Sequence, residues 1–325
     1  MDRRKFMEAI GGALVCASVA SAQQPRKMLR IGWLSGSSFV NTPLADTFLA
    51  AMRESGWIEG QHFTIENLLS EGHSERFPAL AAELVQRNVD LIVTAGTPPT
   101  VAARKATSSI PILFYFVGDP VGSGLVDNLA RPGGNVTGLG GLGPGVHTKQ
   151  LELLKEAAPA ATRIAMLTNS TLKLHEAYRA ELTPAARRLG LTLVPVEIRV
   201  PEEIDAAFAT IAGAKVDALV ILGQPFWFGA SEKVARLARE QRLPATIAFV
   251  ELAHAGLLMA YGSRVVDDIR RLPYYIDRIV KGAKPGELPV EQPTRFYLSV
   301  NLQTAKAIGL VVPQSLLLRA DEVIQ

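Results

Sequence analysis

The stretch Arg30–Ser35, RIGWLS, is a short apolar segment, and it has a counterpart 133 residues later in Arg163–Ser170, RIAMLTNS. The same spacing separates Ile110-Pro111, which precedes ILFYFV, from Leu243-Pro244, which precedes ATIAFV. Each run is rich in β-branched residues, bounded by turn-forming residues, and followed by a segment of helical periodicity. This pattern is typical of a β-α-β-α unit with a parallel sheet, and the chain contains it twice.

The duplication predicts an α/β fold of two doubly wound parallel-sheet lobes joined by crossing hinge strands. We expect the first lobe to comprise residues 30–141 and about 262–290, and the second 142–261 and about 291–325. The C-terminal tail lies outside the duplication and is expected to make the third crossing between the lobes. Two such lobes create a cleft that suits a small molecule.

The first residues have the three parts of a secretory signal peptide. Arg3-Arg4-Lys5 is a charged segment, Ala9–Val19 is apolar, and Ala20-Ser21-Ala22 is a cleavage site. We therefore expect residues 1–22 to be removed and the protein to be periplasmic. The paired arginines also partly match a twin-arginine signal, which leaves this route and ordinary secretion open. Cys16, the only cysteine, lies in the leader, so the mature chain is predicted to lack thiol chemistry.

Several functions are disfavoured by what the sequence lacks. The net charge is only +3 and the basic residues are scattered, which argues against nucleic acid as a partner. Gly138–Gly143 matches the dinucleotide-binding glycine pattern but falls at the predicted lobe crossing, where a flexible hinge is the better interpretation. We find no phosphate-binding loop, nucleophile elbow or zinc-like histidine pair, so we predict no cofactor, no metal and no enzymatic activity.

In a parallel sheet, ligands meet the loops that follow the carboxyl ends of the strands. Hydroxyls at the starts of helices and nearby aromatic rings could hold a flat ligand with an anionic end. Asp119 either caps a short helix predicted over residues 123–130 or faces the ligand. Three consecutive aromatic residues, Phe226–Phe228, cannot all face a core, so at least one should line the cleft or the lobe contact. The candidate ligand-binding residues from these positions are Ser37, Thr97, Asp119, Asn169, Ser170, Gln224, Trp227 and Phe249.

The chain resembles the periplasmic substrate-binding proteins of ABC transporters, of the type associated with tryptophan and other aromatic amino acids. The resemblance covers essentially the whole mature chain. Its segments are RIGWLS at Arg30, ESGWIEGQHFTIE at Glu54, DLIVTAGTP at Asp90, GDPVGSGLVDNLARPGGNVTG at Gly118, KQLELLKEAAP at Lys149, AGLLMAYG at Ala255, and residues 279–324.

This resemblance implies a type I periplasmic binding fold and transport rather than catalysis, with delivery of the ligand to a membrane permease. It also implies that Ser35, Ser37 and Thr97 hold a ligand carboxylate. Members often carry an Asp where this chain has Gln224, and a neutral amide cannot make a charge-assisted bond to an ammonium. An aromatic or apolar amino acid, a related carboxylate and an amide all stay open, and Asp119 or Glu251 could supply the charge. A sensory binding module and an exported α/β enzyme are the alternative functions.

Overall fold

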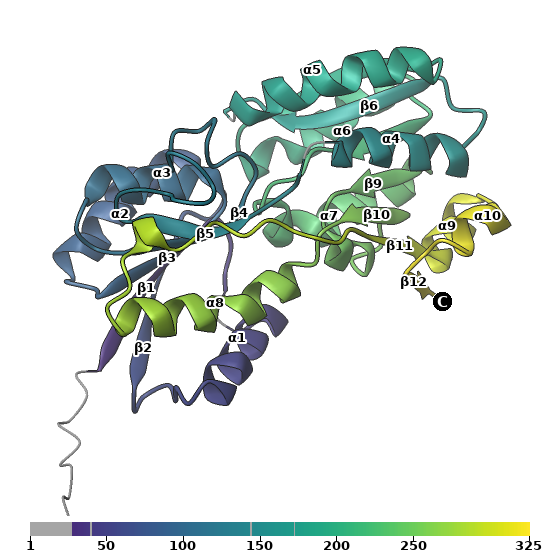
Figure 1. The fold of residues 1–325 in the computed structure, drawn as a ribbon. Coiled ribbons are helices and arrows are strands. Elements are labelled where there is room, and N and C mark those ends of the chain that lie inside the picture. The colour runs from purple at the N-terminus through teal and green to yellow at the C-terminus, as the bar shows by residue number, and fades with distance from the viewer. Residues whose placement is uncertain (1–27, 40, 144, 172) are drawn as a thin grey trace, which may run out of the picture.

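The computed structural model describes residues 28–325, except residues 40, 144 and 172. The predicted signal peptide therefore lies outside the described residues. The described chain forms two α/β lobes, each built on its own sheet (Figure 1).

The first sheet has five parallel strands in the order β2-β1-β3-β4-β5. These strands are β1 (Leu29–Ser35), β2 (Phe63–Leu69), β3 (Leu91–Ala95), β4 (Ile112–Val117) and β5 (Val136–Gly140). The three central strands are buried from both sides, which explains their continuous apolar sequences. Helices α2 (Phe77–Gln86) and α3 (Thr97–Ala106) cover one face, and α1 (Pro43–Glu54) and α8 (Val265–Val280) cover the other.

The second sheet has seven strands in the order β12-β11-β10-β9-β8-β6-β7. Only the β10–β11 pair is antiparallel among the described pairings. The strands are β6 (Arg163–Asn169), β7 (Thr192–Ile198), β8 (Ala218–Ile221), β9 (Ala245–Ile247), β10 (Met259–Gly262), β11 (Tyr297–Asn301) and β12 (Glu322–Ile324). Its helices are α4 (Val146–Ala157), α5 (Lys173–Arg188), α6 (Ile204–Gly213), α7 (Trp227–Glu240), α9 (Leu302–Ile308) and α10 (Gln314–Leu317).

The chain passes between the two sheets three times (Figure 1). The first passage follows β5, and the second joins β10 to α8. The third leads from the segment after α8 back to β11. This third passage is fixed to the first lobe, because Val290 donates its N–H to the carbonyl of Leu129 at 2.7 Å and Thr137 donates its hydroxyl to the carbonyl of Leu288 at 2.7 Å. The three neighbouring passages are the connections about which the lobes could rotate.

Two of the expected elements differ from the structure. Residues 123–130 form turns rather than the predicted helix. Gly124 takes a left-handed φ of 67°, and the carbonyl of Pro120 accepts hydrogen bonds from the N–H groups of both Leu125 and Val126. The predicted strand 245–250 ends at Ile247 and is followed by the 3-10 helix η3 (Val250–Ala253). In residues 123–130, the left-handed Gly124 and the doubly used carbonyl of Pro120 prevent a helix from continuing.

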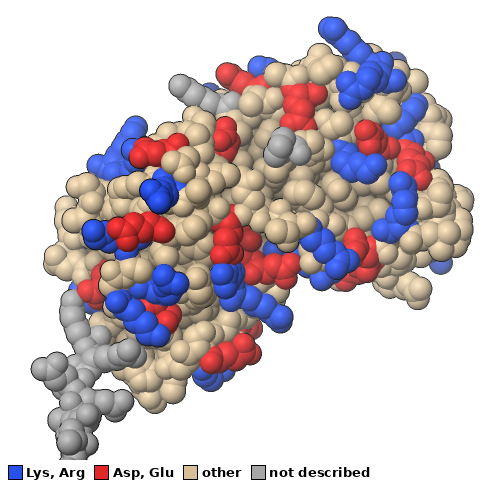
Figure 2. All heavy atoms as spheres, viewed as in Figure 1, with Lys and Arg blue, Asp and Glu red and all other residues tan. Residues whose placement is uncertain are grey.

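Acidic and basic side chains are interspersed over the face seen in Figure 2, without a continuous stripe of one sign. Within residues 28–325, apart from the three omitted positions, no helix is long and apolar enough to cross a bilayer.

Candidate functional site

A cavity of about 830 Å³ lies where the two lobes face each other. Its walls are the loops after β1, β2, β3 and β4 of the first sheet and those after β6 and β8 of the second. The carboxyl ends of parallel strands open onto the same edge of a sheet, so this is the position expected for a ligand in such a fold. The volume is within the range of sites for small molecules.

Most of the cavity wall is apolar. Both lobes contribute, and the larger apolar residues of the wall are Phe77, Pro78, Pro98, Pro99, Val101, Phe116, Leu142, Leu174, Pro225 and Phe226. Such a wall favours a ligand with an apolar or aromatic body, because removing apolar surface from water is favourable by roughly 25 cal/mol per Å² before the costs of association are counted.

Phe116, which lines the cavity, has a backbone conformation that bulky residues rarely adopt. Its φ is 62°, in the left-handed region, and the pairing of β4 with β5 shifts register between Tyr115 and Val117. The N–H of Gly141 donates to the carbonyl of Val117 at 2.7 Å and holds the distorted strand end in place. A left-handed backbone at a bulky residue costs free energy, so it persists only where the surrounding structure holds it. Such residues are concentrated at functional sites.

His175 contributes a neutral donor to the wall. Its Nδ1 accepts the backbone N–H of Asn169 at 2.8 Å, which places the ring proton of the neutral form on Nε2. Burial lowers the pKa of His175 to about 3, with a further contribution from His147 and an opposing one from the backbone of Gly223. His175 is therefore uncharged at neutral pH. Among the described residues, Nε2 has no hydrogen-bond partner.

Gln224 and Ser70 add two more polar groups, one from each lobe. Both residues line the cavity and are buried, with 6% and 0% of their surface exposed. The Gln224 Nε2 and Ser70 Oγ atoms are fully buried and find no partner in the part of the chain that the structure describes. Buried polar groups are nearly always hydrogen-bonded, so these atoms point to a ligand or water as the missing partner.

The charged groups of the wall are Lys105 and Asp119, and both residues are exposed. Asp119 also has a structural role, because its Oδ1 accepts the N–H of Gly122 at 2.7 Å and its carbonyl accepts the N–H of Ser123 at 3.0 Å. Asp119 thus both caps the turn after β4 and borders the cavity. No group of three or more His, Cys, Asp or Glu side chains among the described residues is placed to hold a metal ion.

Three of the predicted site residues line the cavity, namely Thr97, Asp119 and Gln224. Thr97 begins α3 and is followed by Pro98 and Pro99. Because proline lacks an N–H, the start of this helix offers fewer donors to an anion than the sequence-based expectation assumed.

Four predicted polar residues are not part of the cavity wall. Ser35 is buried and donates its hydroxyl to the carbonyl of Ser37 at 2.7 Å, so the pair closes the loop after β1 on itself. The Asn169 side chain accepts the N–H of Thr171 at 2.9 Å and holds the turn after β6. Ser170 is exposed, and its N–H donates to the carbonyl of Ile198.

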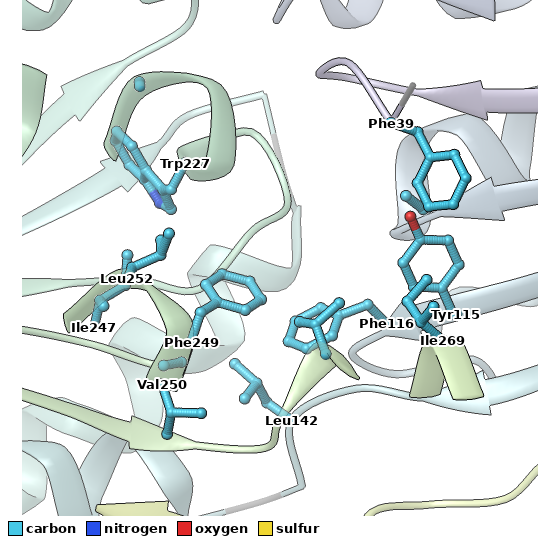
Figure 3. Packing of buried hydrophobic residues seen from close by; sticks show 14 of the residues in the cluster. Phe39, Tyr115, Phe116, Leu142, Trp227, Ile247, Phe249, Val250, Leu252 and Ile269 are labelled. Carbon is cyan, nitrogen blue, oxygen red and sulfur yellow. The ribbon is translucent and has the colours of Figure 1, made fainter. Parts of the chain in front are cut away.

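The predicted aromatic residues Trp227 and Phe249 are core residues in the structure and do not line the cavity (Figure 3). Trp227 has 1% of its surface exposed, and its Nε1 donates to the carbonyl of Leu222 at 2.8 Å. Its neighbour Phe226 lines the cavity instead. Of the three consecutive aromatics, Phe226 is the one in the cavity wall, whereas α7 begins at Trp227 and turns its ring into the core.

Ser70 and His175 were not among the predicted site residues. Ser70 directly follows β2, at the carboxyl end of a parallel strand, where a ligand is expected. His175 lies in the first turn of α5, after the candidate loop that ends β6. Its place in the helix after a cleft-facing strand is the available signal, but strand order does not tell which side chain of that helix faces the cavity.

The two lobes touch each other around the cavity. The ring of Phe116 packs on that of Phe249 with their centroids 4.4 Å apart. His73 Nε2 lies 3.5 Å from a carboxylate oxygen of Glu202. A Cβ atom placed on Gly118 would lie 2.5 Å from Leu174 and 2.6 Å from the hydroxyl of Tyr178. These contacts describe a closed arrangement of the lobes.

Similar proteins agree with this geometry. A tryptophan complex of an ABC domain from Streptococcus pneumoniae superposes with a TM-score of 0.80 at 26% identity, covering 92% of this chain and 100% of the other. A ligand-free, open substrate-binding protein with adhesive properties from Clostridium difficile gives a TM-score of 0.61 at 25% identity, covering 92% and 100%. The better agreement with the tryptophan complex is in keeping with the contacts between the lobes. Together these structures show the type I periplasmic binding fold.

The sequence comparisons lead to the same family. The tyrosine-binding protein of Clostridioides difficile (strain R20291) is 26% identical over 267 residues, which cover 81% of this chain and 75% of that protein. The pattern of the family described as ABC transporter substrate binding protein matches residues 38–324. The chain therefore belongs to the family of ABC transporter substrate-binding proteins.

Proposed function

We propose that this protein is the exported solute-binding component of an ABC import system. It captures an aromatic or apolar amino acid, or a related carboxylate, between its lobes and delivers the solute to a membrane permease. The lobes comprise residues 30–141 with about 262–290, and residues 142–261 with about 291–325. The signal peptide of residues 1–22 takes the chain to the periplasm.

The cavity between the lobes is the observation that carries this proposal. Both lobes contribute apolar walls, and Gln224, His175 and Ser70 present buried polar atoms that lack a partner within the described chain. A solute that met these groups would hold the lobes together, because it would contact both at once. Binding energy would thereby be coupled to the closed shape that a permease can recognise. An aromatic solute is also supported by two similar proteins, one named as a tyrosine-binding protein and the other solved in complex with tryptophan.

A thermal-shift screen of the purified protein tests the proposal. The panel contains amino acids, aromatic acids, their amides and, as a contrast, sugars. A true ligand at about one hundred times its dissociation constant stabilises the folded state by roughly 2.7 kcal/mol. Small-angle scattering of the same samples should show a smaller radius of gyration with ligand. The proposal fails if no solute in the panel stabilises the protein.

A further inference from the structure

The cavity contains little negative charge with which to hold an ammonium group. Asp119 is the single acidic residue among the described residues of its wall, and it is exposed. One of its carboxylate oxygens already accepts the N–H of Gly122 at 2.7 Å. A buried ammonium without an ionised partner is strongly disfavoured, so an amino acid seated deep in this cavity would lack the partner that it needs.

The buried carboxyl groups of Glu251 and Asp268 do not compensate. Glu251 and Asp268 are not part of the cavity wall, and Glu251 Oε1 accepts the N–H of Val266 at the start of α8. Burial raises the pKa of both carboxyl groups, which favours their neutral forms. Among the described residues of the cavity wall, Asp119 is therefore the one carboxylate that an ammonium group could meet.

The same interior offers hydrogen-bond donors that need an acceptor. His175 and Gln224 are close together, because the backbone of Gly223, the residue before Gln224, is near enough to His175 to raise its pKa, although it does not meet Nε2 with hydrogen-bond geometry. Each presents a buried Nε2 that has no partner in the described chain, and Ser70 adds a hydroxyl from the opposite lobe. A carboxylate only accepts hydrogen bonds and can take several at once, so it complements these groups.

We propose that the cavity selects an aromatic or branched apolar monocarboxylate that carries no ammonium group, with Gln224 and His175 donating to its carboxylate. The apolar wall, which includes Phe116 and Phe226, receives the rest of the molecule. This inference rests on the proposed solute-binding function and names the class of solute. Gln224 is the specificity residue, because its amide stands where an acidic side chain would favour an ammonium.

Matched pairs of compounds that differ only at the amino group test this preference. Isothermal titration calorimetry compares phenylalanine with 3-phenylpropionate, tryptophan with indole-3-propionate, and leucine with 4-methylpentanoate. We expect the acid without the ammonium to bind at least about tenfold more tightly in one or more pairs, as one unmatched buried charge suffices for such a difference. If the amino acid binds equally or more tightly in every pair, the inference is wrong while the solute-binding function stands.

Two other results also decide the matter. If sugars bind and no member of the aromatic or branched pairs does, the proposed class is wrong although the protein binds solutes. If no solute of any kind binds, the proposed function itself fails and the inference fails with it.

Variants of Gln224 provide an independent test. Gln224→Glu places a negative charge near the ligand head, so it should weaken binding of the acids about tenfold or more and strengthen binding of the amino acids. Gln303→Glu is the matched control, because Gln303 is exposed and donates to the carbonyl of Gln325 far from the cavity. It should leave both affinities unchanged.

Gln224→Met keeps the size of the side chain without its amide, and it should weaken acid binding while leaving the amino acids unimproved. Melting curves without ligand check that each variant is folded. If Gln224→Glu proves unfolded, the Met variant decides. Unchanged acid affinity in a folded Gln224→Met variant overturns the role given to Gln224.

Discussion

The rings of Phe116 and Phe249 pack against each other across the two lobes, with 4.4 Å between their centroids and a tilt of 39° between their planes. Phe116 is the residue before the last of β4 in the first sheet, and Phe249 follows β9 of the second. Phe116 reaches this position through a left-handed backbone with φ of 62°. Since Phe116 also lines the cavity, one side chain belongs both to the contact between the lobes and to the cavity wall.

Shortening this ring should loosen the closed arrangement. An aromatic pair contributes about 0.5–1.5 kcal/mol beyond its area burial, so Phe116→Leu should raise the open population of the ligand-free protein several-fold. Small-angle scattering should record a larger radius of gyration. Phe114→Leu, two residues earlier in the same strand, is the control because Phe114 is buried within the first lobe. It should lower stability by about 1 kcal/mol without changing the scattering. Equal scattering for both variants would remove Phe116 from the closing contact.

A side chain at Gly118 should obstruct closure directly. The backbone of Gly118 does not have a positive φ, so another residue can occupy this position within the first lobe. In the closed arrangement, however, its Cβ would lie 2.5 Å from Leu174 and 2.6 Å from the hydroxyl of Tyr178. Gly118→Val should therefore weaken ligand binding at least about tenfold, which corresponds to about 1.4 kcal/mol, as measured by calorimetry.

The control for this substitution is Gly213→Val at the end of α6, where no atom lies within 4 Å of the added Cβ. Gly213→Val should leave affinity and scattering as they are in the wild type. Normal affinity in Gly118→Val would mean that the ligand-bound lobes do not approach as closely as they do here.

The sequence predicted the sheets well because their strands are continuous apolar runs between turn residues. β1, β4 and β6 lie within one or two residues of the expected bounds. The same rule of parallel strands places Thr97, Asp119 and Gln224 at one cavity, as the structure does, since it depends only on strand direction.

The remaining site could not be predicted because it depends on helix phase and on how the lobes dock. Phe226 and Trp227 are adjacent and similar in hydrophobicity, and only the start of α7 at Trp227 decides which ring faces the cavity. His175 lies in a helix of the second lobe, and it lines the cavity because the first lobe docks opposite that helix. Periodicity within one segment contains neither kind of information.

Substitutions at Trp227 and Phe226 should affect different properties, the first mainly stability and the second mainly ligand binding. Trp227→Phe removes the hydrogen bond to the carbonyl of Leu222 and leaves a cavity, so it should lower the free energy of unfolding by about 1–3 kcal/mol. Its effect on ligand affinity should be small. Phe226→Ala should weaken binding by about 1–2 kcal/mol and destabilise the protein less, because Phe226 is only partly buried. Urea unfolding measures the stability of both variants, and calorimetry measures their ligand affinity. If Trp227→Phe weakened binding more than Phe226→Ala did, Trp227 would belong to the binding site.

The buried carboxyl group of Asp268, near the second lobe crossing, gives the protein a pH dependence of known sign. Burial raises the pKa of Asp268 well above its usual range, and Asp267, Glu251 and Glu291 add to the effect. Within the described chain, Asp268 Oδ2 has no hydrogen-bond partner. A carboxyl group whose pKa is higher in the folded state stabilises that state below its unfolded pKa, near 3.8. This contribution is lost as the pH rises through the folded value.

Asp268→Asn should therefore stabilise the protein at pH 7.5, by about 1–3 kcal/mol, because the amide is neutral in both states, whereas the buried carboxyl must either keep a proton that the unfolded chain releases or ionise without a partner. Near pH 4 the wild-type carboxyl is already protonated, so the gain should shrink. Asp217→Asn is the control of opposite sign. The backbone N–H groups of Thr162 and Arg163 donate to its carboxylate at 2.7 and 2.9 Å and lower its pKa, so losing that carboxylate should destabilise the protein at pH 7.5 and less so in acid. Urea midpoints at the two pH values measure both variants. A loss of stability in Asp268→Asn that is equal at both pH values would show that Asp268 is held as a partnered anion.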